Sequence, residues 1–202
     1  MMLTINDISC SIKDKLIFKN LGFSVGCGSC LLLTGKNGSG KSTLLKVIAT
    51  ILKPHRGFLS WNGHKITDIE DDYRADILYL GVNNFFKLQL TVKENIEFWA
   101  NMFGQDILIP SAIEYFNLSQ NLSKKIIDLS AGWKQISFLS QLIFRQANIW
   151  ILDEPSKDLD NNSKQLLFDL ISIKISQGGI VILASHDEIF HPLGKKLNLE
   201  DF

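Results

Sequence analysis

The sequence contains no long apolar run. No segment approaches the roughly 18 apolar residues that a membrane-spanning helix requires, so we expect none that crosses a bilayer. The opening MMLTINDISC lacks the basic and apolar regions of a secretory signal. These absences predict a soluble chain that would meet a membrane only through a partner.

An excess of either charge is also absent. Lys and Arg together number 21, and Asp and Glu also number 21, so the formal net charge is +0. No run of like charge stands out along the chain. This balance excludes a global field that would recruit nucleic acid or an anionic membrane, and we expect no nucleic-acid partner.

Cysteine is scarce, and an odd count of 3 without a signal predicts reduced thiols in a cytosolic compartment. Two of the cysteines form the C-x-x-C pattern Cys27-Gly-Ser-Cys30. Haem attachment needs a following His, where this chain has Leu31, and Cys10 is the only other thiol for a zinc site. Because Cys30 begins a predicted strand, a thioredoxin-type site at a helix start is disfavoured. We interpret the stretch as a turn, with redox chemistry as the minor alternative.

The rest of the composition suits a globular protein, since 202 residues with 46% apolar content match one domain with a sizeable core. Asn62-Gly63 between alternating residues predicts a hairpin turn. Apolar alternation and short apolar runs predict strands at 3–8, 16–18, 23–25, 30–34, 58–61, 76–80, 148–152 and 180–184.

Helical spacing begins after Lys41, and Pro54 should stop that helix. Thr91 followed by Glu94 predicts a capping box at the start of another helix. Further helices are expected at 111–118, 133–146 and 164–177. The expected fold is therefore α/β, a strand–helix core with a mostly helical insertion.

The stretch Gly35-Lys-Asn-Gly-Ser-Gly-Lys-Ser-Thr43 has the Walker A pattern, and it follows a predicted buried strand and opens a predicted helix. Its glycines allow successive backbone N–H groups to surround phosphates, with the helix dipole behind them. Lys41 would place a charge on the β- and γ-phosphates, and the Ser42 hydroxyl suits a Mg²⁺ ligand. The stretch predicts a phosphate-binding loop that works with Mg²⁺.

Two adjacent acids end the apolar strand Asn148-Ile-Trp-Ile-Leu152. The carboxyl edge of such a strand is where ligands gather in α/β sheets, so Asp153 could hold Mg²⁺ through water. Glu154 could then polarise the water that attacks the γ-phosphate. Alone, the pair would indicate a solvated turn, but beside a Walker A loop it favours catalysis.

Together these motifs resemble the ATP-binding-cassette (ABC) ATPases. Leu129-Ser-Ala-Gly132 is similar to their signature, about 20 residues before the Walker B acids, and Ser156-Lys-Asp-Leu-Asp160 is similar to their D-loop. His186 follows a strand where their switch histidine lies. The resemblance implies the P-loop ABC-ATPase fold, with a mixed-sheet nucleotide-binding core in 1–83 and 147–202 and a helical subdomain in 84–146.

The resemblance also implies a role for each matching residue. In this family two cassettes face each other head to tail, so Ser130, Ala131 and Gly132 of one copy, after Leu129, would bind the γ-phosphate held by the other. ATP and Mg²⁺ are the implied cofactors, and Ser156 and Asp160 would lie near the dimer seam. The expected nucleotide-binding residues are Gly35, Lys36, Asn37, Gly38, Ser39, Gly40, Lys41, Ser42, Thr43 and Ile12.

Four positions depart from the family pattern. Ile12 aligns with the residue that should stack on adenine, and Asn83 stands where a catalytic glutamine is usual. Trp133 replaces a common glutamine after the signature, and Asp158 replaces a small D-loop residue. Because Asp153, Glu154 and Lys41 are present, we expect ATP hydrolysis that is slow and depends strongly on a partner.

Within the family, the chain is similar to the ATPase subunits of cytochrome c maturation haem exporters, the CcmA type. The shared strings include 18–25, 149–155 and 177–183, and little follows His186. This likeness implies a peripheral subunit on the cytoplasmic face of the inner membrane, acting with haem only through the wider complex. An integral membrane subunit would dock on the helical subdomain, with Phe85 and Phe86 as the best candidates for contact.

Other functions remain open at this point. The chain could serve another small ABC transporter, or be a soluble ABC ATPase that works on nucleic acid or ribosomes, although it has no second cassette or basic arm. It could also be a regulatory subunit that binds ATP with little turnover. Asn83 and Trp133 favour that last alternative, whereas Glu154 and His186 weigh against it.

Overall fold

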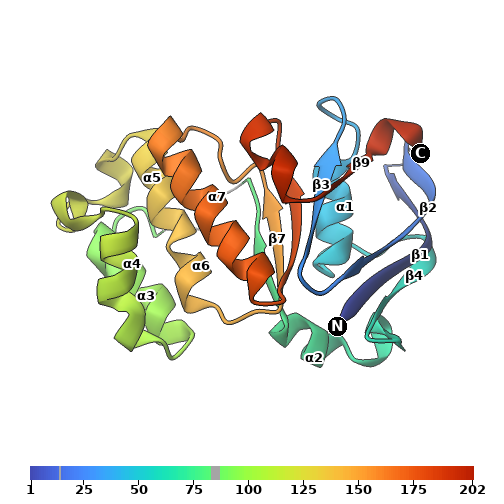
Figure 1. Ribbon diagram of the computed structural model, residues 1–202, viewed down its shortest axis with the longest axis horizontal. Coiled ribbons are helices and arrows are strands. Elements are labelled where there is room, and N and C mark those ends of the chain that lie inside the picture. Colours follow the sequence, from blue (N-terminus) through green and yellow to red (C-terminus); the bar gives the residue numbers. More distant parts are fainter. Residues whose placement is uncertain (14, 83–86) are drawn as a thin grey trace. The chain divides into compact units, whose positions relative to one another are not determined.

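The computed structural model describes residues 1–13, 15–82 and 87–202 (Figure 1). By their internal contacts these residues form two compact units. Unit 1 contains residues 1–81, 147–154 and 171–202, and unit 2 contains 82–146 and 155–170. The division into core and helical subdomain that the sequence suggests stays a prediction; the contacts group 155–170 with unit 2.

The helices and strands alternate along much of the chain. The strands are β1 (Met2–Ile12), β2 (Lys15–Gly26), β3 (Ser29–Thr34), β4 (Arg56–Trp61), β5 (His64–Lys65), β6 (Ile77–Leu80), β7 (Ile149–Asp153), β8 (Ile180–Ala184) and β9 (Lys195–Asn198). The α-helices are α1 (Lys41–Ile48), α2 (Glu70–Ala75), α3 (Val92–Met102), α4 (Ile109–Tyr115), α5 (Ala131–Leu139), α6 (Gln141–Phe144) and α7 (Asn161–Ser176). This order confirms the α/β fold class.

Parallel and antiparallel strands lie in separate sheets of unit 1. The antiparallel sheet has the order β2-β1-β4-β5, and its last connection is the turn predicted at Asn62-Gly63, where both residues have positive φ. The parallel sheet has the order β6-β7-β8-β3-β9. Since β3, β7 and β8 are mutually parallel, the residues that follow them leave the sheet at one edge.

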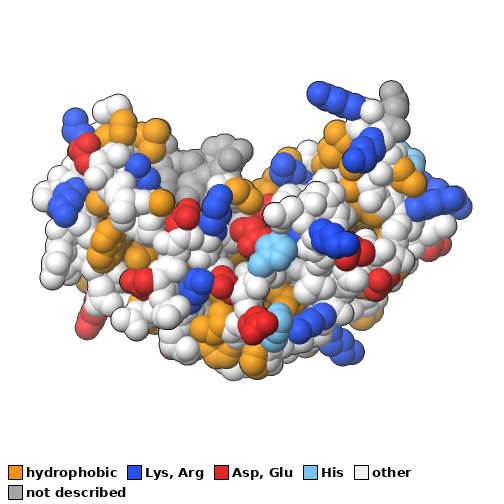
Figure 2. Space-filling view, turned by 90° about the horizontal axis from the view of Figure 1, so that it is seen from above, with side chains coloured by type: hydrophobic (Ala, Val, Ile, Leu, Met, Phe, Trp, Pro, Cys, Tyr) orange, Lys and Arg blue, Asp and Glu red, His pale blue; other side chains and the backbone are white. Residues whose placement is uncertain are grey.

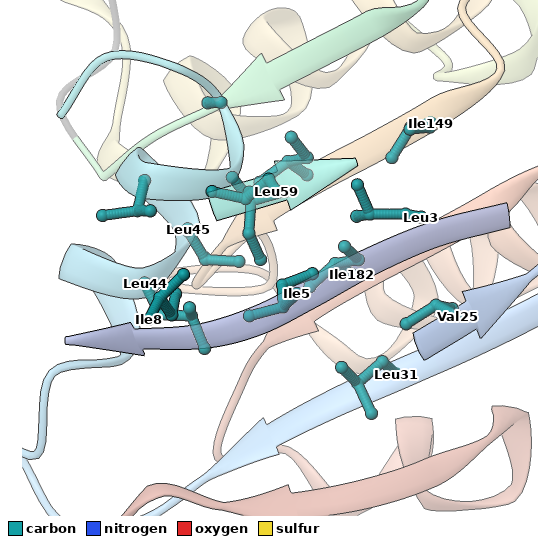
Figure 3. Packing of buried hydrophobic residues seen from close by; sticks show 14 of the residues in the cluster. Leu3, Ile5, Ile8, Val25, Leu31, Leu44, Leu45, Leu59, Ile149 and Ile182 are labelled. Atoms are coloured by element: carbon teal, nitrogen blue, oxygen red, sulfur yellow. The ribbon is translucent and has the colours of Figure 1, made fainter. Parts of the chain in front are cut away.

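The main core of unit 1 joins both sheets through α1. In Figure 3, Leu44 and Leu45 of α1 lie close to Ile5 and Ile8 of β1. The same buried cluster includes Ile182 and other residues of the parallel sheet. Burying these side chains holds α1, and therefore the loop that precedes it, against the end of β3.

Helix α1 ends before Pro54, so the expectation that proline stops it was wrong. The helix closes at Ile48 because Thr50 takes a left-handed conformation with φ 57°. The N–H groups of Thr50 and Ile51 then donate to the carbonyls of Val47 and Lys46, at 3.1 and 2.9 Å. This is the Schellman pattern, which satisfies the last carbonyls of a helix.

Unit 2 is helical over most of its length, as expected. Thr91 and Glu94 form the predicted capping box at the start of α3. The single helix predicted over 133–146 is wrong, however, because Ser140 separates α5 from α6. The Ser140 hydroxyl donates to the Ser137 carbonyl at 2.7 Å, which competes with the backbone ladder at this point.

The structure also bears on two expectations from the sequence, the distribution of charge and the membrane-spanning helices. Basic and acidic side chains are interspersed on the face shown in Figure 2, as the balanced charge predicts. In the described part of the chain, no helix is both long enough and apolar enough to cross a membrane.

Candidate functional site

The phosphate loop connects β3 to α1 at the carboxyl edge of the parallel sheet (Figure 1). Gly35, Gly38 and Gly40 have positive φ values of 129°, 86° and 99°, a conformation that side chains disfavour. Gly40 directly precedes the first residue of α1, and the Ser39 N–H donates to the Lys36 carbonyl at 3.1 Å. The glycine spacing therefore builds a curved loop at a helix start.

Lys41 is held inside this loop. Lys41 is only 7% exposed. Its Nζ donates hydrogen bonds to the carbonyl oxygens of Gly35 at 2.7 Å and Lys36 at 3.1 Å. These two carbonyls satisfy a buried ammonium that would otherwise be costly. They also fix its position at the centre of the loop.

Asp153 ends β7 and is buried, at 3% exposure. Burial raises the pKa of its carboxyl, although a hydrogen bond from Ser42 and the charges of Lys46 and Lys41 act in the opposite direction. Its Oδ1 atom has no hydrogen-bond partner among the residues that the structure describes. A buried carboxylate oxygen without a partner, beside a serine hydroxyl, is a donor set that fits Mg²⁺.

Glu154 follows Asp153 and has a positive φ of 49°, a left-handed conformation that is uncommon for a residue other than glycine. Its N–H donates to the Ala184 carbonyl at 2.8 Å, so β8 holds the residue in this conformation. Burial raises the pKa of the Glu154 carboxyl, and the charges of His186 and Lys41 lower it. A raised carboxylate pKa suits a general base.

His186 connects the acids to the phosphate loop. Its Nε2 lies 3.5 Å from Glu154 Oε1 and 3.2 Å from Asn37 Oδ1. The ring sits just after β8, as the sequence predicts, and its residue is exposed. Three segments far apart in the chain thus meet at one imidazole.

Asn37, Lys41, Asp153 and Glu154 border one cavity of about 220 Å³ in unit 1, and His186 lies beside Glu154 without lining it. Of the predicted residues, Gly35, Lys36 and Ser39 belong to the same loop but do not line the cavity, and neither does Ile12. The lining residues are Ile17, Asn37, Gly38, Gly40, Lys41, Ser42, Thr43, Asp153 and Glu154.

Ile17 is the cavity residue that sequence reasoning missed. A Cβ on Gly40 would lie 2.6 Å from Ile17 Cγ2, so the missing side chain at Gly40 allows β2 to approach the loop. Ile17 lies next to the buried Phe18 in β2. In the sequence, an apolar residue at such a position in a strand looks the same as an ordinary core residue. Ile12, the predicted base contact, is exposed at the end of β1.

Three predictions lie outside the described residues, namely those for Asn83, Phe85 and Phe86.

The signature and D-loop residues line a separate cavity in unit 2, of about 610 Å³. Ser130 caps α5 by accepting the Trp133 N–H at 3.4 Å, and Asp160 caps α7 by accepting the Ser163 N–H at 2.7 Å. Leu129 and Ser156 are buried. The cavity is lined by Phe116, Asn117, Ser130, Ala131, Gly132, Trp133, Ile136, Asp158, Asp160, Asn162, Ser163 and Leu166.

Signature and D-loop pack directly on each other within unit 2. A Cβ on Gly132 would lie 2.8 Å from the Asp158 carbonyl oxygen, and Gln135 Nε2 donates to the Pro155 carbonyl at 2.7 Å. Asp158 itself has a positive φ of 64°. The two motifs therefore form one surface, which the sequence could not show because they are separated along the chain.

Within the C-x-x-C stretch, Cys27 and Gly28 form the turn between β2 and β3 that was interpreted from the sequence, and Cys30 lies in β3. Cys27 is exposed, whereas Cys30 is buried and burial raises its pKa to about 12. A thiol with so high a pKa is a poor nucleophile at neutral pH.

Comparison with known proteins agrees with this geometry. A sequence model of the family described as ABC transporter matches residues 18–157. The protein named cytochrome c biogenesis ATP-binding export protein CcmA from Wolbachia pipientis wMel is 39% identical over 185 residues, which cover 92% of this chain and 89% of that protein. The protein of the same name from Paramagnetospirillum magneticum is 35% identical, over 97% of this chain and 93% of that protein.

Solved structures show the same fold. One from Pyrococcus furiosus, described as an ABC transporter ATP-binding protein, has a TM-score of 0.85 and 28% identity over 100% of this chain and 99% of that one. The family match covers more than half of the chain, and the relatives cover nearly all of it. The chain belongs to the ABC transporter family.

Proposed function

We propose that this protein is the ATP-hydrolysing subunit of an export complex in cytochrome c biogenesis, the haem exporter that the sequence resemblance implies. The observation that carries the proposal is the gathering of Lys41, Ser42, Asp153 and Glu154 around one cavity, with His186 beside Glu154. The relatives that carry the cytochrome c biogenesis name support the choice of pathway.

ATP binding would use the curved loop and its lysine. Backbone N–H groups at the start of α1 would face the phosphates, and the helix dipole would favour their negative charge. Lys41 would exchange its contacts with the Gly35 and Lys36 carbonyls for the β- and γ-phosphate oxygens. Ile17 would form an apolar wall beside the nucleotide.

Ser42 and Asp153 would hold Mg²⁺, the latter through water. When bound, the ion would neutralise charge on the β- and γ-phosphate oxygens. The Asp153 oxygen without a partner and the hydrogen bond from Ser42 support this assignment.

Hydrolysis would proceed by attack of water on the γ-phosphorus, with breakage of its bond to the bridging oxygen and departure of ADP. Glu154 would orient the water and take up its proton, for which its raised pKa is suited. His186, 3.5 Å from Glu154, would keep that carboxylate in position and contact the γ-phosphate side of the site.

The signature surface of unit 2 would complete the site of a second copy. Ser130 and the N–H groups of Ala131 and Gly132 lie at the start of α5 and line the 610 Å³ cavity, where phosphate oxygens of the other copy's ATP would bind. Ser156 and Asp160 would lie near the dimer seam, and Asp160 is one of the residues that line that cavity. The active form is therefore proposed to be a dimer.

A membrane subunit would dock on unit 2. Phe116 is buried, at 3% exposure, and packs in the core, whereas Phe98 is 36% exposed, with Lys87 Nζ 4.6 Å from the centroid of its ring. Leu88, Met102 and Ile127 are also exposed in this unit. We place the working protein at the cytoplasmic face of the inner membrane through this partner.

Cofractionation tests the proposed association with a membrane complex. The chain should sediment with inner membranes from the native host and return to the supernatant when its membrane partner is deleted. A matched Lys41→Ala variant should still sediment, because docking would not depend on nucleotide binding. A chain that stays in the supernatant, or sediments without the partner, would contradict the proposed role.

A further inference from the structure

Residues 195–202, here called the 195–202 segment, run beside the phosphate loop although no sequence motif marks them. β9 pairs in parallel with β3, and Asn198 lies opposite Thr34, the last residue of β3. Thr34 Oγ1 donates to the Leu197 carbonyl at 3.4 Å. The segment therefore leaves the sheet at the same place as Gly35, where the loop begins.

Asn198 occupies part of the space that a side chain on Gly35 would need. A Cβ at this glycine would lie 2.7 Å from Ser39 Oγ and 3.3 Å from Asn198 Oδ1. The first residue of the loop is thus packed between the loop itself and the 195–202 segment. Only glycine, with its φ of 129°, permits so close an approach.

The segment is fixed to unit 1 rather than free to move with the loop. Leu199 is 3% exposed and belongs to the main core. Asn198 Oδ1 accepts the Glu200 N–H at 3.2 Å, and Asn198 Nδ2 donates to Asp201 Oδ1 at 3.1 Å. The Asn198 side chain is therefore held in one orientation, facing Gly35.

What Asn198 contacts is the part of the loop that holds the lysine. The carbonyls of Gly35 and Lys36 both accept hydrogen bonds from Lys41 Nζ. Lys36 Nζ also lies 3.5 Å from Glu200 Oε1, but both side chains are well exposed and such a pair contributes little. The packing of the half-buried Asn198 side chain against Gly35, not this ion pair, carries the connection.

We propose that Asn198 is a positioning residue for the phosphate loop. By packing on Gly35 it holds the Gly35 and Lys36 carbonyls in the arrangement that orients Lys41 for an incoming nucleotide. This inference rests on the proposed function, because it takes nucleotide binding by Lys41 as given.

The test uses the full chain in four forms: wild type, Asn198→Ala, Asn198→Ser and Lys196→Ala. Serine can still cap the Glu200 N–H but is too short to reach Gly35, and Lys196 is an exposed residue of the same strand. Hydrogen exchange of the amides of residues 36–40 is measured without nucleotide, and the Kd for MgATP is measured separately.

Both Asn198 variants should bind MgATP about fivefold more weakly and exchange the loop amides faster by a similar factor, as the loss of one good contact predicts. Lys196→Ala should match the wild type in both measurements. Wild-type exchange and Kd in both Asn198 variants would overturn the inference, and so would a normal Asn198→Ser beside a weakened Asn198→Ala, since the role would then be capping alone.

The experiment distinguishes failure of the positioning role of Asn198 from failure of the proposed function. A wild-type chain that binds MgATP normally, with unaffected Asn198 variants, removes only the positioning role. A wild-type chain that does not bind MgATP overturns the proposed function and the inference together. If Asn198→Ala does not fold, the milder Asn198→Ser carries the comparison.

Discussion

His186 Nε2 lies 3.5 Å from Glu154 Oε1, and the same nitrogen lies 3.2 Å from Asn37 Oδ1. One imidazole therefore contacts both the carboxylate assigned as the base and the side chain at the tip of the phosphate loop. A change in the conformation of the loop, such as one that accompanies nucleotide binding, would therefore shift the His186 ring and with it the Glu154 carboxylate.

Replacing His186 by Ala should lower the rate of ATP hydrolysis by about 100-fold, because the base loses the group that holds it, a loss in the range for acid–base catalysis. The Kd for MgATP should change far less, since Lys41 and the loop remain. Steady-state turnover and equilibrium binding measure the two effects. His55→Ala, at an exposed position in unit 1, serves as the control and should leave both unchanged.

The ionised carboxylate of Asp153 should lower the free energy of unfolding of the nucleotide-free protein at neutral pH. Its pKa is raised on folding from 3.8, so the folded state holds the proton more tightly than the unfolded chain. Stability therefore falls as the pH rises from the unfolded pKa through the raised one, and the loss persists at neutral pH.

The variant Asp153→Asn should accordingly raise the Tm of the free protein by about 2–4 °C at neutral pH, and by less near pH 4. It should at the same time abolish the stabilisation that Mg²⁺ adds to bound ATP. Thermal unfolding at the two pH values measures this. A lower Tm at neutral pH would show that the carboxylate stabilises the fold, contrary to the account.

Lys41→Ala should remove the charge that faces the phosphates and weaken MgATP binding by at least about tenfold, the loss expected for a charge-assisted hydrogen bond. Because two backbone carbonyls lose their donor, the protein should also be less stable. Isothermal titration with MgATP gives the binding constant. Lys196→Ala, at an exposed position of β9 outside the loop, is the control and should bind normally.

Gly132→Ala should separate dimer-dependent turnover from nucleotide binding. Its new Cβ would lie 2.8 Å from the Asp158 carbonyl, so signature and D-loop must move apart. Hydrolysis in the assembled complex should fall about tenfold or more, as for the loss of a group that positions charge in the transition state. Binding of MgATP to the single chain should not change.

The control for this substitution is Gly26→Ala, where a Cβ would meet no atom of the described residues within 4 Å. It should retain normal turnover and binding. Equal losses in both variants would show that the effect comes from glycine replacement in general and not from the contact with Asp158.

Much of the site could be predicted because its chemistry is local in sequence. The glycine spacing before Lys41 predicts a phosphate loop, and the two acids at the end of β7 predict a metal ligand and a base. The parallel sheet brings both motifs to one edge. The Thr91–Glu94 capping box was equally readable, since both partners lie within one helical turn.

The features that were missed depend on tertiary contacts. Strand β9 carries Lys195 and Lys196 without apolar alternation, and it forms because β3 offers an edge to pair with. Ile17 looks like core until Gly40 brings the loop against it. The ends of α1 and α5 are set by Thr50 and Ser140, where hydrogen bonds override helical spacing.

The most direct test of the account is the turnover of ATP by the chain in its membrane complex, compared between wild type and Glu154→Gln across a range of pH. Glu154 has a pKa raised above 4.5, so wild-type hydrolysis should decline as the pH falls and protonates this base. Glu154→Gln should bind MgATP normally but hydrolyse it at least about 100-fold more slowly, without that decline. Equal turnover in the two proteins would contradict the assignment of the base and with it the proposed mechanism.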